Sequence, residues 1–381
     1  MVISEYGSIF SIVLFGYLLV PAVILGLLEK RITYYGIIIS IPVLYLLIGS
    51  KWIYFFGFIA YEVFLIYLYF YGKRHFKSKY FYYFVIVLSI LPIAYVKSLY
   101  LTHLKVISIL GISYMCFRIW QIIIEIHDEH IQRLDLVYLL YFITFFPTLS
   151  SGPIDRFNRF IEDAKKKIVR QEYMDNYLVI GIQKIFWGLI YKFGVANLIN
   201  LYMLSKISKT LTFISGIEYM YVYTLYLFFD FAGYSNLAIG TSYILGIKAP
   251  ENFNKPFLAK NMKEFWERWH MSLSKWFGDY IFSRFVLNVM RNRWIHKRST
   301  AARVGFMVTM TTMGIWHGLT IYYILYGLYQ GIALALTDKY LKSKAHRRHL
   351  KSPHYTLISR IICFHTVAFG LLLFSGYLIR F

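Results

Sequence analysis

The chain has 381 residues, of which 58% are hydrophobic and only 16% are charged. Soluble globular domains rarely have this composition, so it predicts a membrane protein. The 41 Lys and Arg exceed the 19 Asp and Glu and give a net charge of +22. These cations lie between apolar runs, which is typical of membrane-protein loops and argues against a nucleic-acid-binding surface.

Apolar runs follow one another along the whole chain. A transmembrane helix needs roughly 20 mainly apolar residues. We expect spanning or re-entrant helices at residues 8–28, 33–50, 52–71, 80–97, 103–124, 136–151, 177–200, 217–246, 304–325, 320–337 and 356–380. Several runs are short or overlap, so the prediction is an all-α polytopic membrane protein with about 10–12 such helices. No repeat or linker divides the chain, which favours one membrane domain over residues 1–381.

Proline and glycine interrupt two of these runs. Pro147 lies in the run 136–151, and Gly314, Gly318 and Gly327 lie between residues 304 and 337. Breaks at membrane depth are tolerated only where protein or water surrounds the backbone. We therefore expect broken or re-entrant helices at both places.

Basic loops predict the orientation in the membrane. Residues 29–31, 72–79 and 339–351 are rich in Lys and Arg. Such loops usually lie on the cytoplasmic side, so the N-terminus and Phe381 are expected on the outer face.

The stretch 253–303 is basic and amphipathic, which favours an interfacial helix over a spanning one. Its apolar side chains recur at spacings of three and four residues and form one stripe on a helix. The stripe consists of Met262, Phe265, Trp266, Trp269, Leu273, Trp276, Phe277 and Tyr280. His270 falls at its edge. A membrane-surface anchor would explain the tryptophans but not the histidine.

His317 lies in the sequence MGIWHG, within a segment that otherwise has the character of a membrane helix. An ionisable group there is costly and indicates a functional site, and the flanking glycines allow a ligand or a helix to approach closely. A structural histidine bonded across helices is the alternative. A buried neutral imidazole could accept the proton of a hydroxyl group, as a general base for acyl transfer does.

Asp230 lies at or near membrane depth, because it follows the apolar residues 227–229. It is either a helix-end carboxylate capped by Tyr or Ser hydroxyls or a group that lines a polar cavity. The chain has no zinc-peptidase, α/β-hydrolase or nucleotide-binding motif, and its two cysteines lie far apart. We therefore expect no metal site.

Four blocks of the sequence resemble the membrane-bound O-acyltransferase family, namely residues 146–156, 230–235, 251–274 and 314–318. Within the family, the SSGPIDR sequence at 150–156 and the run 280–293 are similar to proteins that transfer D-alanyl groups to teichoic acids. Alginate-type polysaccharide O-acetyltransferases share the two WH sequences. They usually continue after the first one with a Pro-Leu-Gly-Gly-Asn-Arg-like turn, which this chain lacks.

The resemblance implies a ring of tilted helices around a central funnel, in a bacterial plasma membrane. It implies His317 as the catalytic base or proton shuttle and His270 as the residue that orients donor or acceptor. Other residues expected to line the funnel are Trp316, Asp230, Ser235 and Trp269.

The resemblance also implies the partners. The donor would be a thioester on the phosphopantetheine arm of a D-alanyl carrier protein at the cytoplasmic face, with no cofactor bound directly. The acceptor would be a hydroxyl group of (lipo)teichoic acid outside the cell. Further membrane proteins of the same D-alanylation system and membrane lipids would be additional partners, and nucleic acid would not be one.

The helix after the first WH sequence is a candidate docking site for the carrier protein. Apolar residues recur at helical spacing and basic residues surround them, which suits an acidic carrier. The set is Arg284, Phe285, Val286, Val289, Met290, Arg291 and Arg293. Alternatively, this patch inserts into the lipid headgroup region of the membrane.

Two other functions remain open from the residues. One is polysaccharide O-acetylation of the alginate type. The other is a proton-coupled transporter or lipid flippase, which intramembrane histidines would also suit. The lack of inverted-repeat symmetry and the scarcity of intramembrane carboxylates argue against transport.

Overall fold

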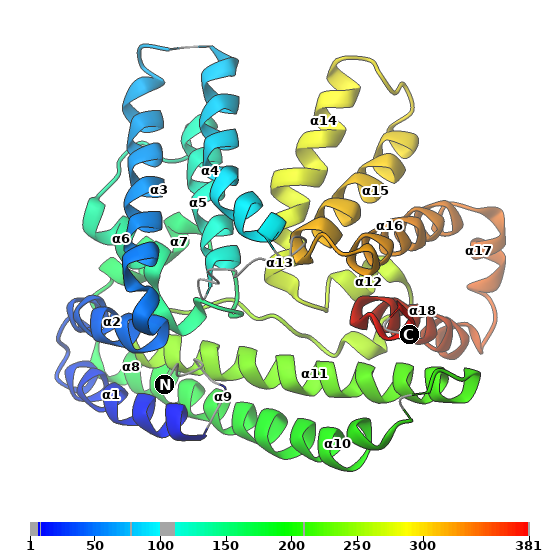
Figure 1. The fold of residues 1–381 in the computed structure, drawn as a ribbon, viewed down its shortest axis with the longest axis horizontal. Helices are drawn as coiled ribbons and strands as arrows, with labels where there is room; N and C mark the ends of the chain where they lie inside the picture. The colour runs from blue at the N-terminus through cyan, green and yellow to red at the C-terminus, as the bar shows by residue number, and fades with distance from the viewer. Residues whose placement is uncertain (1–6, 8, 77, 100–110, 209, 380–381) are drawn as a thin grey trace. The chain divides into compact units, whose positions relative to one another are not determined.

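The structure is a computed structural model that describes residues 7, 9–76, 78–99, 111–208 and 210–379. The described residues form helices and short connections, with one isolated β-bridge and no strand (Figure 1). The predicted all-α membrane fold is confirmed. The chain forms two compact units, Met1–Leu189 with Gly233–Pro250 and Ile190–Ala232 with Glu251–Phe381. A single membrane domain stays a prediction.

The helices of the first unit are α1 (Ile9–Leu27), α2 (Ile32–Ile48), α3 (Trp52–Gly72), α4 (Lys79–Leu99), α5 (Ile112–His127), α6 (Leu136–Thr144), α7 (Phe157–Lys165), α8 (Arg170–Tyr173) and α9 (Val179–Leu189). Those of the second are α10 (Asn197–Tyr202), α12 (Met262–Trp266), α13 (Met271–Phe277), α14 (Ser283–Arg291), α15 (Arg298–His317), α16 (Ile321–Leu341), α17 (Lys344–His349) and α18 (Tyr355–Ser375). Helix α11 (Phe213–Ile244) contributes residues 213–232 to the second unit and 233–244 to the first.

The apolar runs correspond to helices. Among the described residues, four helical stretches are long and apolar enough to cross a membrane, namely Ile32–Gly72, Lys79–Leu99, Arg170–Lys206 and Tyr355–Ser375. Residues 103–110 of one predicted run lie outside the described residues, and so does Phe381. The total of about 10–12 membrane helices and the ring around a funnel stay predictions.

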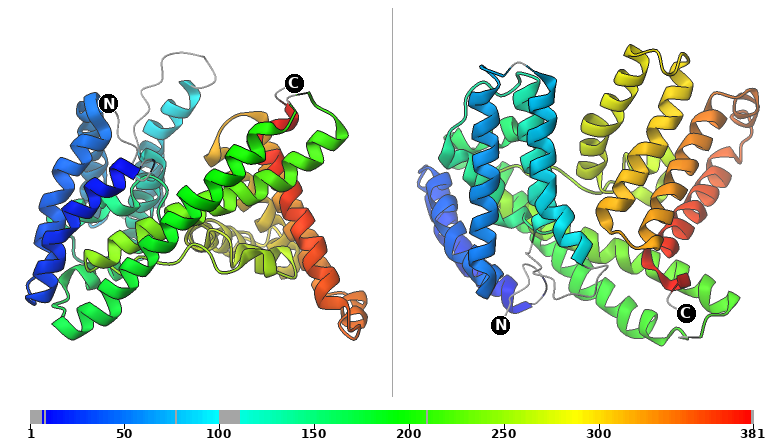
Figure 2. Two further views of the ribbon diagram at one scale, coloured as in Figure 1. Left: turned by 90° about the horizontal axis from the view of Figure 1, so that it is seen from below. Right: turned by 45° about the horizontal axis from the view of Figure 1, so that its top comes forward.

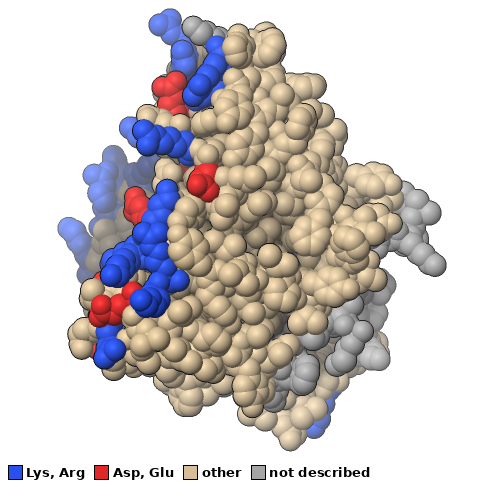
Figure 3. Space-filling model, turned by 90° about the vertical axis from the view of Figure 1, so that its left-hand side faces the viewer, with Lys and Arg blue, Asp and Glu red and all other residues tan. Residues whose placement is uncertain are grey.

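The first unit presents an apolar exterior. Ile38, Ile53 and Phe64 are 65%, 62% and 61% exposed, and α3 and α4 lie side by side (Figure 2). Figure 3 shows that charged side chains gather along one edge of this face and that most of the remaining face is uncharged. Large exposed apolar surface of this kind suits contact with lipid.

The predicted break in the run 136–151 is confirmed. Helix α6 ends at Thr144, and Pro147 lies in a short 3₁₀ turn, Phe146–Thr148. Proline lacks a backbone N–H and therefore cannot continue the α-helical hydrogen bonding. The last carbonyl groups of α6 consequently need partners from outside the helix.

Arg118 of α5 supplies those partners. Its side chain is buried, and Nη1 donates to the carbonyl oxygens of Phe142 and Ile143 at 2.9 and 3.0 Å. Nη2 donates to the carbonyl oxygen and the hydroxyl of Thr148 at 2.6 and 2.5 Å. A guanidinium fork can satisfy several acceptors at once, so one buried cation stabilises the broken end of α6.

The predicted break within residues 304–337 is confirmed at Gly318, where α15 ends, but the breaks expected at Gly314 and Gly327 are wrong. Helix α15 continues through Gly314 and α16 through Gly327, and only Gly318 lies at the end of a helix. A Cβ atom on Gly314 would lie 3.0 Å from the Cα of Gly327 and would clash with the carbonyl oxygen of Tyr323. These glycines therefore allow α15 and α16 to pack closely, as small residues do between membrane helices. The run expected at 304–325 ends at His317 instead.

We predict that Arg118→Met destabilises the protein by roughly 2–4 kcal/mol, because several buried carbonyl groups lose a charged donor. Thermal unfolding of the purified protein in detergent would measure the loss. Arg133→Met is the matched control, because Arg133 is exposed and its loss should change stability by less than about 0.5 kcal/mol. Equal unfolding midpoints for Arg118→Met and the wild type would contradict this role.

Candidate functional site

The apolar stripe between residues 262 and 280 is divided among two helices, the non-helical residue Trp269 and a π-helical turn, so the prediction of one interfacial helix is wrong. Helix α12 ends at Trp266 and α13 begins at Met271. The eight stripe residues are at most 8% exposed, so they form part of the core of the second unit and not a membrane-surface anchor. Periodicity identified the apolar side chains but could not show that protein covers them.

His270 makes the break between α12 and α13. Its φ of 42° lies in the left-handed region, which is uncommon for residues other than glycine. A short antiparallel contact holds this conformation: Phe253 forms a β-bridge with Trp269, and the Met271 N–H donates to the Asn252 carbonyl oxygen at 2.9 Å. Strained backbone held by its surroundings is frequent at functional sites.

The same segment fixes the imidazole of His270. Its Nδ1 lies 3.3 Å from Oδ1 of the buried Asn252, and the Ser272 hydroxyl donates to the same oxygen at 2.6 Å. An amide oxygen can only accept, so Nδ1 is the protonated nitrogen and Nε2 carries the lone pair. The Phe231 ring packs edge-on against the imidazole, with 4.8 Å between ring centroids.

Burial lowers the pKa of His270 to about 3, and the nearby His317 shifts that pKa in the same direction. A buried imidazole loses the water that would stabilise its charged form. His270 is therefore a neutral ring of defined tautomer at physiological pH.

His317 is the last residue of α15. Aromatic rings surround its imidazole: Phe374 lies edge-on at 4.9 Å between centroids, Trp316 at 4.6 Å, and Tyr323 is stacked at 6.0 Å. The carbonyl end of a helix dipole favours positive charge. Its position at this end would therefore stabilise the charge that an imidazole gains when it accepts a proton.

Both histidines line one cavity of about 70 Å³ in the second unit. Trp269, another predicted site residue, also lines it, and the remaining lining is apolar or aromatic. Residues 47 positions apart in sequence thus meet at one small site with a mainly apolar lining. Such a site can hold a reacting carbonyl group near two imidazoles and away from bulk water.

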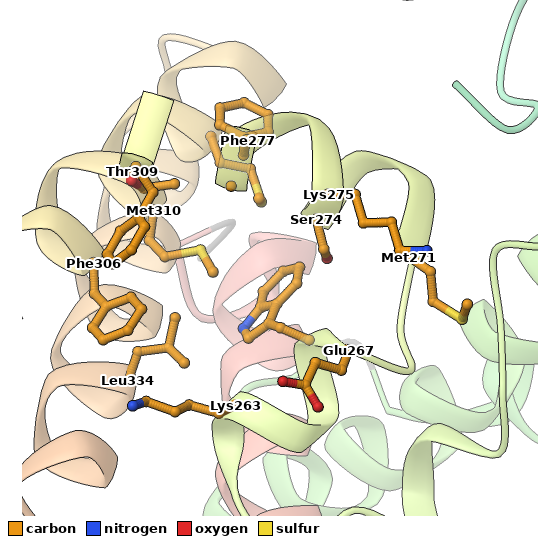
Figure 4. Close-up of a pocket in the computed structure, with 14 residues that line it drawn as sticks. Lys263, Glu267, Met271, Ser274, Lys275, Phe277, Phe306, Thr309, Met310 and Leu334 are labelled. Carbon is orange, nitrogen blue, oxygen red and sulfur yellow. The ribbon is translucent and has the colours of Figure 1, made fainter. Parts of the chain in front are cut away.

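A larger cavity of about 360 Å³ is lined by residues that include Lys263, Thr309 and Leu334 (Figure 4). It adjoins the first cavity, because Trp266 and Met313 line both. Its interior is mainly apolar, whereas Lys263, Glu267 and Lys275 contribute charged groups. The Thr309 hydroxyl is buried in its lining and has no hydrogen-bond partner among the described residues. The cavity therefore offers an apolar chamber with an available polar contact.

Thr309, Met310 and Ser274 line the larger cavity but were not among the predicted site residues. One pattern could have indicated two lining positions. Thr309 and Met313 lie eight and four residues before His317 on α15, which places them along one face of the helix.

The structure does not place Asp230 or Ser235 in the lining of either cavity. The helix-end interpretation of Asp230 is wrong, because Asp230 lies inside α11. Its Oδ1 forms an ion pair with Lys192 Nζ at 2.5 Å. Ser235 is buried in the first unit.

The first motif block belongs to the first unit and connects there to the second block. The Ser150 and Tyr234 hydroxyls lie 2.5 Å apart. Asp155 forms an ion pair with Arg159, and its carbonyl oxygen accepts from Gln121 Nε2 at 2.8 Å. These contacts give the sequence at 150–156 a structural role in its own unit.

The predicted docking helix is α14, and part of its apolar patch packs against α15. Val289 is buried, and a Cβ on Gly305 would lie 2.9 Å from Cγ2 of Val286. Arg291 is exposed, and so is Leu287 at 68%. Arg284, Phe285 and Met290 are half-buried. Carrier docking on α14 stays a prediction, and Val286 contributes to the contact between α14 and α15.

Comparison with known proteins gives matches along most of the chain. The family model of MBOAT, the membrane-bound O-acyltransferase family, matches residues 66–379. Teichoic acid D-alanyltransferase of Bacillus subtilis is 41% identical, with 98% of each chain covered. The teichoic acid D-alanyltransferase of Streptococcus thermophilus is 36% identical over 99% of this chain and 96% of its own. A probable alginate O-acetylase of Pseudomonas fluorescens is 30% identical over 62% of this chain and 46% of its own.

We predict an acid-sensitive contribution of His270 to stability. The folded protein keeps His270 neutral down to about pH 3, whereas the unfolded chain protonates it near pH 6.5. Its contribution to the free energy of unfolding should be complete above pH 6.5 and fall by about 1.4 kcal/mol per pH unit below that value, because only the unfolded chain then binds the proton.

Thermal unfolding of the wild type and His270→Gln, measured from about pH 5 to about pH 7.5, would check this slope. The advantage of the wild type over the variant should shrink as the pH falls. A constant difference between the two proteins across that range would contradict a buried neutral His270.

Proposed function

We propose that this chain, which belongs to the membrane-bound O-acyltransferase family, transfers a D-alanyl group to a hydroxyl group of teichoic acid at a bacterial cell membrane. The observation that carries the proposal is the cavity in which His270 and His317 meet. Similarity over nearly the full length to two teichoic acid D-alanyltransferases supports the D-alanyl group. The probable alginate O-acetylase matches a shorter part at lower identity, which makes acetyl transfer the weaker alternative.

The donor in this proposal is a D-alanyl thioester on the phosphopantetheine arm of a carrier protein. His317 accepts the proton of the teichoic acid hydroxyl as the hydroxyl oxygen attacks the thioester carbonyl carbon. The tetrahedral intermediate then breaks its carbon–sulfur bond, and the leaving thiolate takes the proton back from His317. The products are a D-alanyl ester and a free carrier thiol, so the proton and the electron pair both balance.

His270 acts as a positioning residue in the same scheme. Its Nε2 carries a lone pair but is hard to protonate, because burial lowers the pKa of His270 to about 3. It can therefore accept a hydrogen bond from the ammonium group of the D-alanyl donor without removing its proton. This contact would orient the thioester carbonyl group toward His317.

The larger cavity suits the pantetheine arm of the donor. The arm combines apolar methyl and methylene groups with two amide groups, and the cavity combines an apolar lining with the buried hydroxyl of Thr309. Lys275 in its lining could attract the phosphate at the far end of the arm, whereas Lys263 is already paired with Asp338. Because Trp266 and Met313 line both cavities, the arm would end beside the two histidines.

The orientation belongs to the proposal as well. The carrier protein would dock at the cytoplasmic face and the acceptor would enter from outside, with both chain termini on the outer face. The basic segments at 29–31, 72–79 and 339–351 support this orientation.

His317→Ala should reduce D-alanyl ester formation by about 10²–10⁴-fold, because loss of a general base commonly costs that much. Purified protein in liposomes, labelled D-alanyl carrier and teichoic acid acceptor would measure it. His365→Ala is the control, because His365 lies on α18 and lines neither cavity. Residual turnover above about a tenth of the wild type would refute the assignment. Solute movement without ester formation would support a transporter instead.

The donor cavity is tested by the pair Ser274→Trp and Ser274→Ala. The indole should fill part of the cavity and lower kcat/KM for the acyl carrier by about tenfold or more, because the arm loses its space. Removal of the hydroxyl alone should leave kcat/KM within about threefold of the wild type. Normal kcat/KM in a folded Ser274→Trp variant would place the arm elsewhere.

A further inference from the structure

The connection between α16 and α18 carries an unusual concentration of unpaired positive charge. No acidic residue occurs from residue 339 to the end of the chain. Lys339, Lys344, Arg347, Arg348 and Lys351 are exposed, and none forms an ion pair within the part of the chain that the structure describes. Like charges this close repel one another unless an anion lies between them.

The carboxylate that directly precedes this connection, Asp338, is already occupied. Asp338 is buried, and its two oxygens bind Lys263 Nζ at 2.5 Å and Lys342 Nζ at 2.8 Å. Asp338 is therefore not available to form ion pairs with the exposed cations of α17. An anion from outside the protein could balance their charge.

Two histidine–tyrosine contacts hold α17 in place. His349 Nδ1 lies 2.9 Å from the Tyr340 hydroxyl of α16, and His346 Nδ1 lies 3.3 Å from the Tyr355 hydroxyl of α18. The rings of each pair also contact one another. Helix α17 is thus attached to both neighbouring helices, which gives its arginines a defined position that a flexible linker would not provide.

Exposed apolar side chains lie next to these cations. Leu350 is 53% exposed, and Leu357 and Ile358 in the first turn of α18 are 61% and 51% exposed. Helix α18 is one of the stretches long and apolar enough to cross a membrane. Cations beside the beginning of a lipid-facing helix lie at the level of lipid headgroups.

We propose that α17, with Arg347 and Arg348 at its centre, binds the phosphate groups of anionic membrane lipids. Arginine matches phosphate with paired hydrogen bonds, and each basic residue near an anionic surface adds to the attraction. This surface lies outside both cavities and does not depend on the acyl-transfer proposal. An acidic protein could also meet this charge, but the exposed leucines and isoleucine beside it favour lipid.

The test uses purified protein in a zwitterionic detergent. The protein is titrated with phosphatidylglycerol or with phosphatidylcholine, and its thermal stability reports lipid binding. Wild-type protein should be stabilised by phosphatidylglycerol more than by phosphatidylcholine. Arg347→Gln with Arg348→Gln should weaken the apparent affinity for phosphatidylglycerol roughly 30-fold. Arg133→Gln with Lys167→Gln removes two exposed positive charges elsewhere and should leave that affinity unchanged.

A second variant tests whether lipid binding depends on the defined position of α17 or only on its positive charge. Tyr340→Phe with Tyr355→Phe keeps every charge but removes the hydroxyl groups that hold α17, so it should also weaken binding of phosphatidylglycerol. Wild-type affinity in this variant would overturn the proposal of a defined site.

Further outcomes distinguish the occupants. Equal stabilisation by inorganic phosphate would indicate a site for free phosphate and overturn the lipid assignment. Unchanged lipid affinity in the double arginine variant, together with lost binding of an acidic acyl carrier, would show that α17 binds protein. The proposal would be supported if phosphatidylglycerol stabilises the wild type and the Arg133/Lys167 control more than phosphatidylcholine does. The two lipids should then have equal effects on the double arginine variant and on the double tyrosine variant.

Discussion

Polar groups buried away from water need partners, and this requirement determines how the helices of this protein can be interrupted. Helix α6 can end at Thr144 because the Arg118 side chain donates hydrogen bonds to the carbonyl groups that the break leaves without helical partners. His270 can adopt a left-handed backbone because residues 252 and 253 pair with the chain on both sides of it. Each interruption is therefore stabilised by a segment distant in sequence.

The interruption at His270 also creates the chemical asymmetry of the site. It turns the chain so that an imidazole is fully enclosed, with Asn252 defining its tautomer. His317 instead lies at the carbonyl end of α15, among aromatic rings. Two residues of one type thus occupy different environments, and the proposed division of roles, in which His317 moves a proton while His270 stays neutral, depends on that difference.

Close packing of α15 and α16 supports this arrangement. Gly314 and Gly327 bring the two helices together directly before His317, and Met310 and Met313 on the same stretch line the cavities. Methionine adapts its shape to irregular space, so the chamber beside the histidines combines a rigid helix pair with an adaptable lining. At the other end of α16, Asp338 binds Lys263 and Lys342, which links a cavity residue to the start of the basic connection.

The amino-acid sequence by itself determined where helices form, because runs of apolar residues have few other solutions in a membrane. It also singled out Pro147 as a break and His317 as a candidate functional residue, because proline and an ionisable group are costly in such runs. Only the tertiary structure decided that the stripe at 262–280 is covered by protein, that Asp230 pairs with Lys192, and that His270 and His317 share a cavity. Lipid tails and protein interiors are similarly apolar, so the periodicity of apolar residues cannot show which of the two covers a helix face. Contacts between segments distant in sequence leave no local pattern in the sequence.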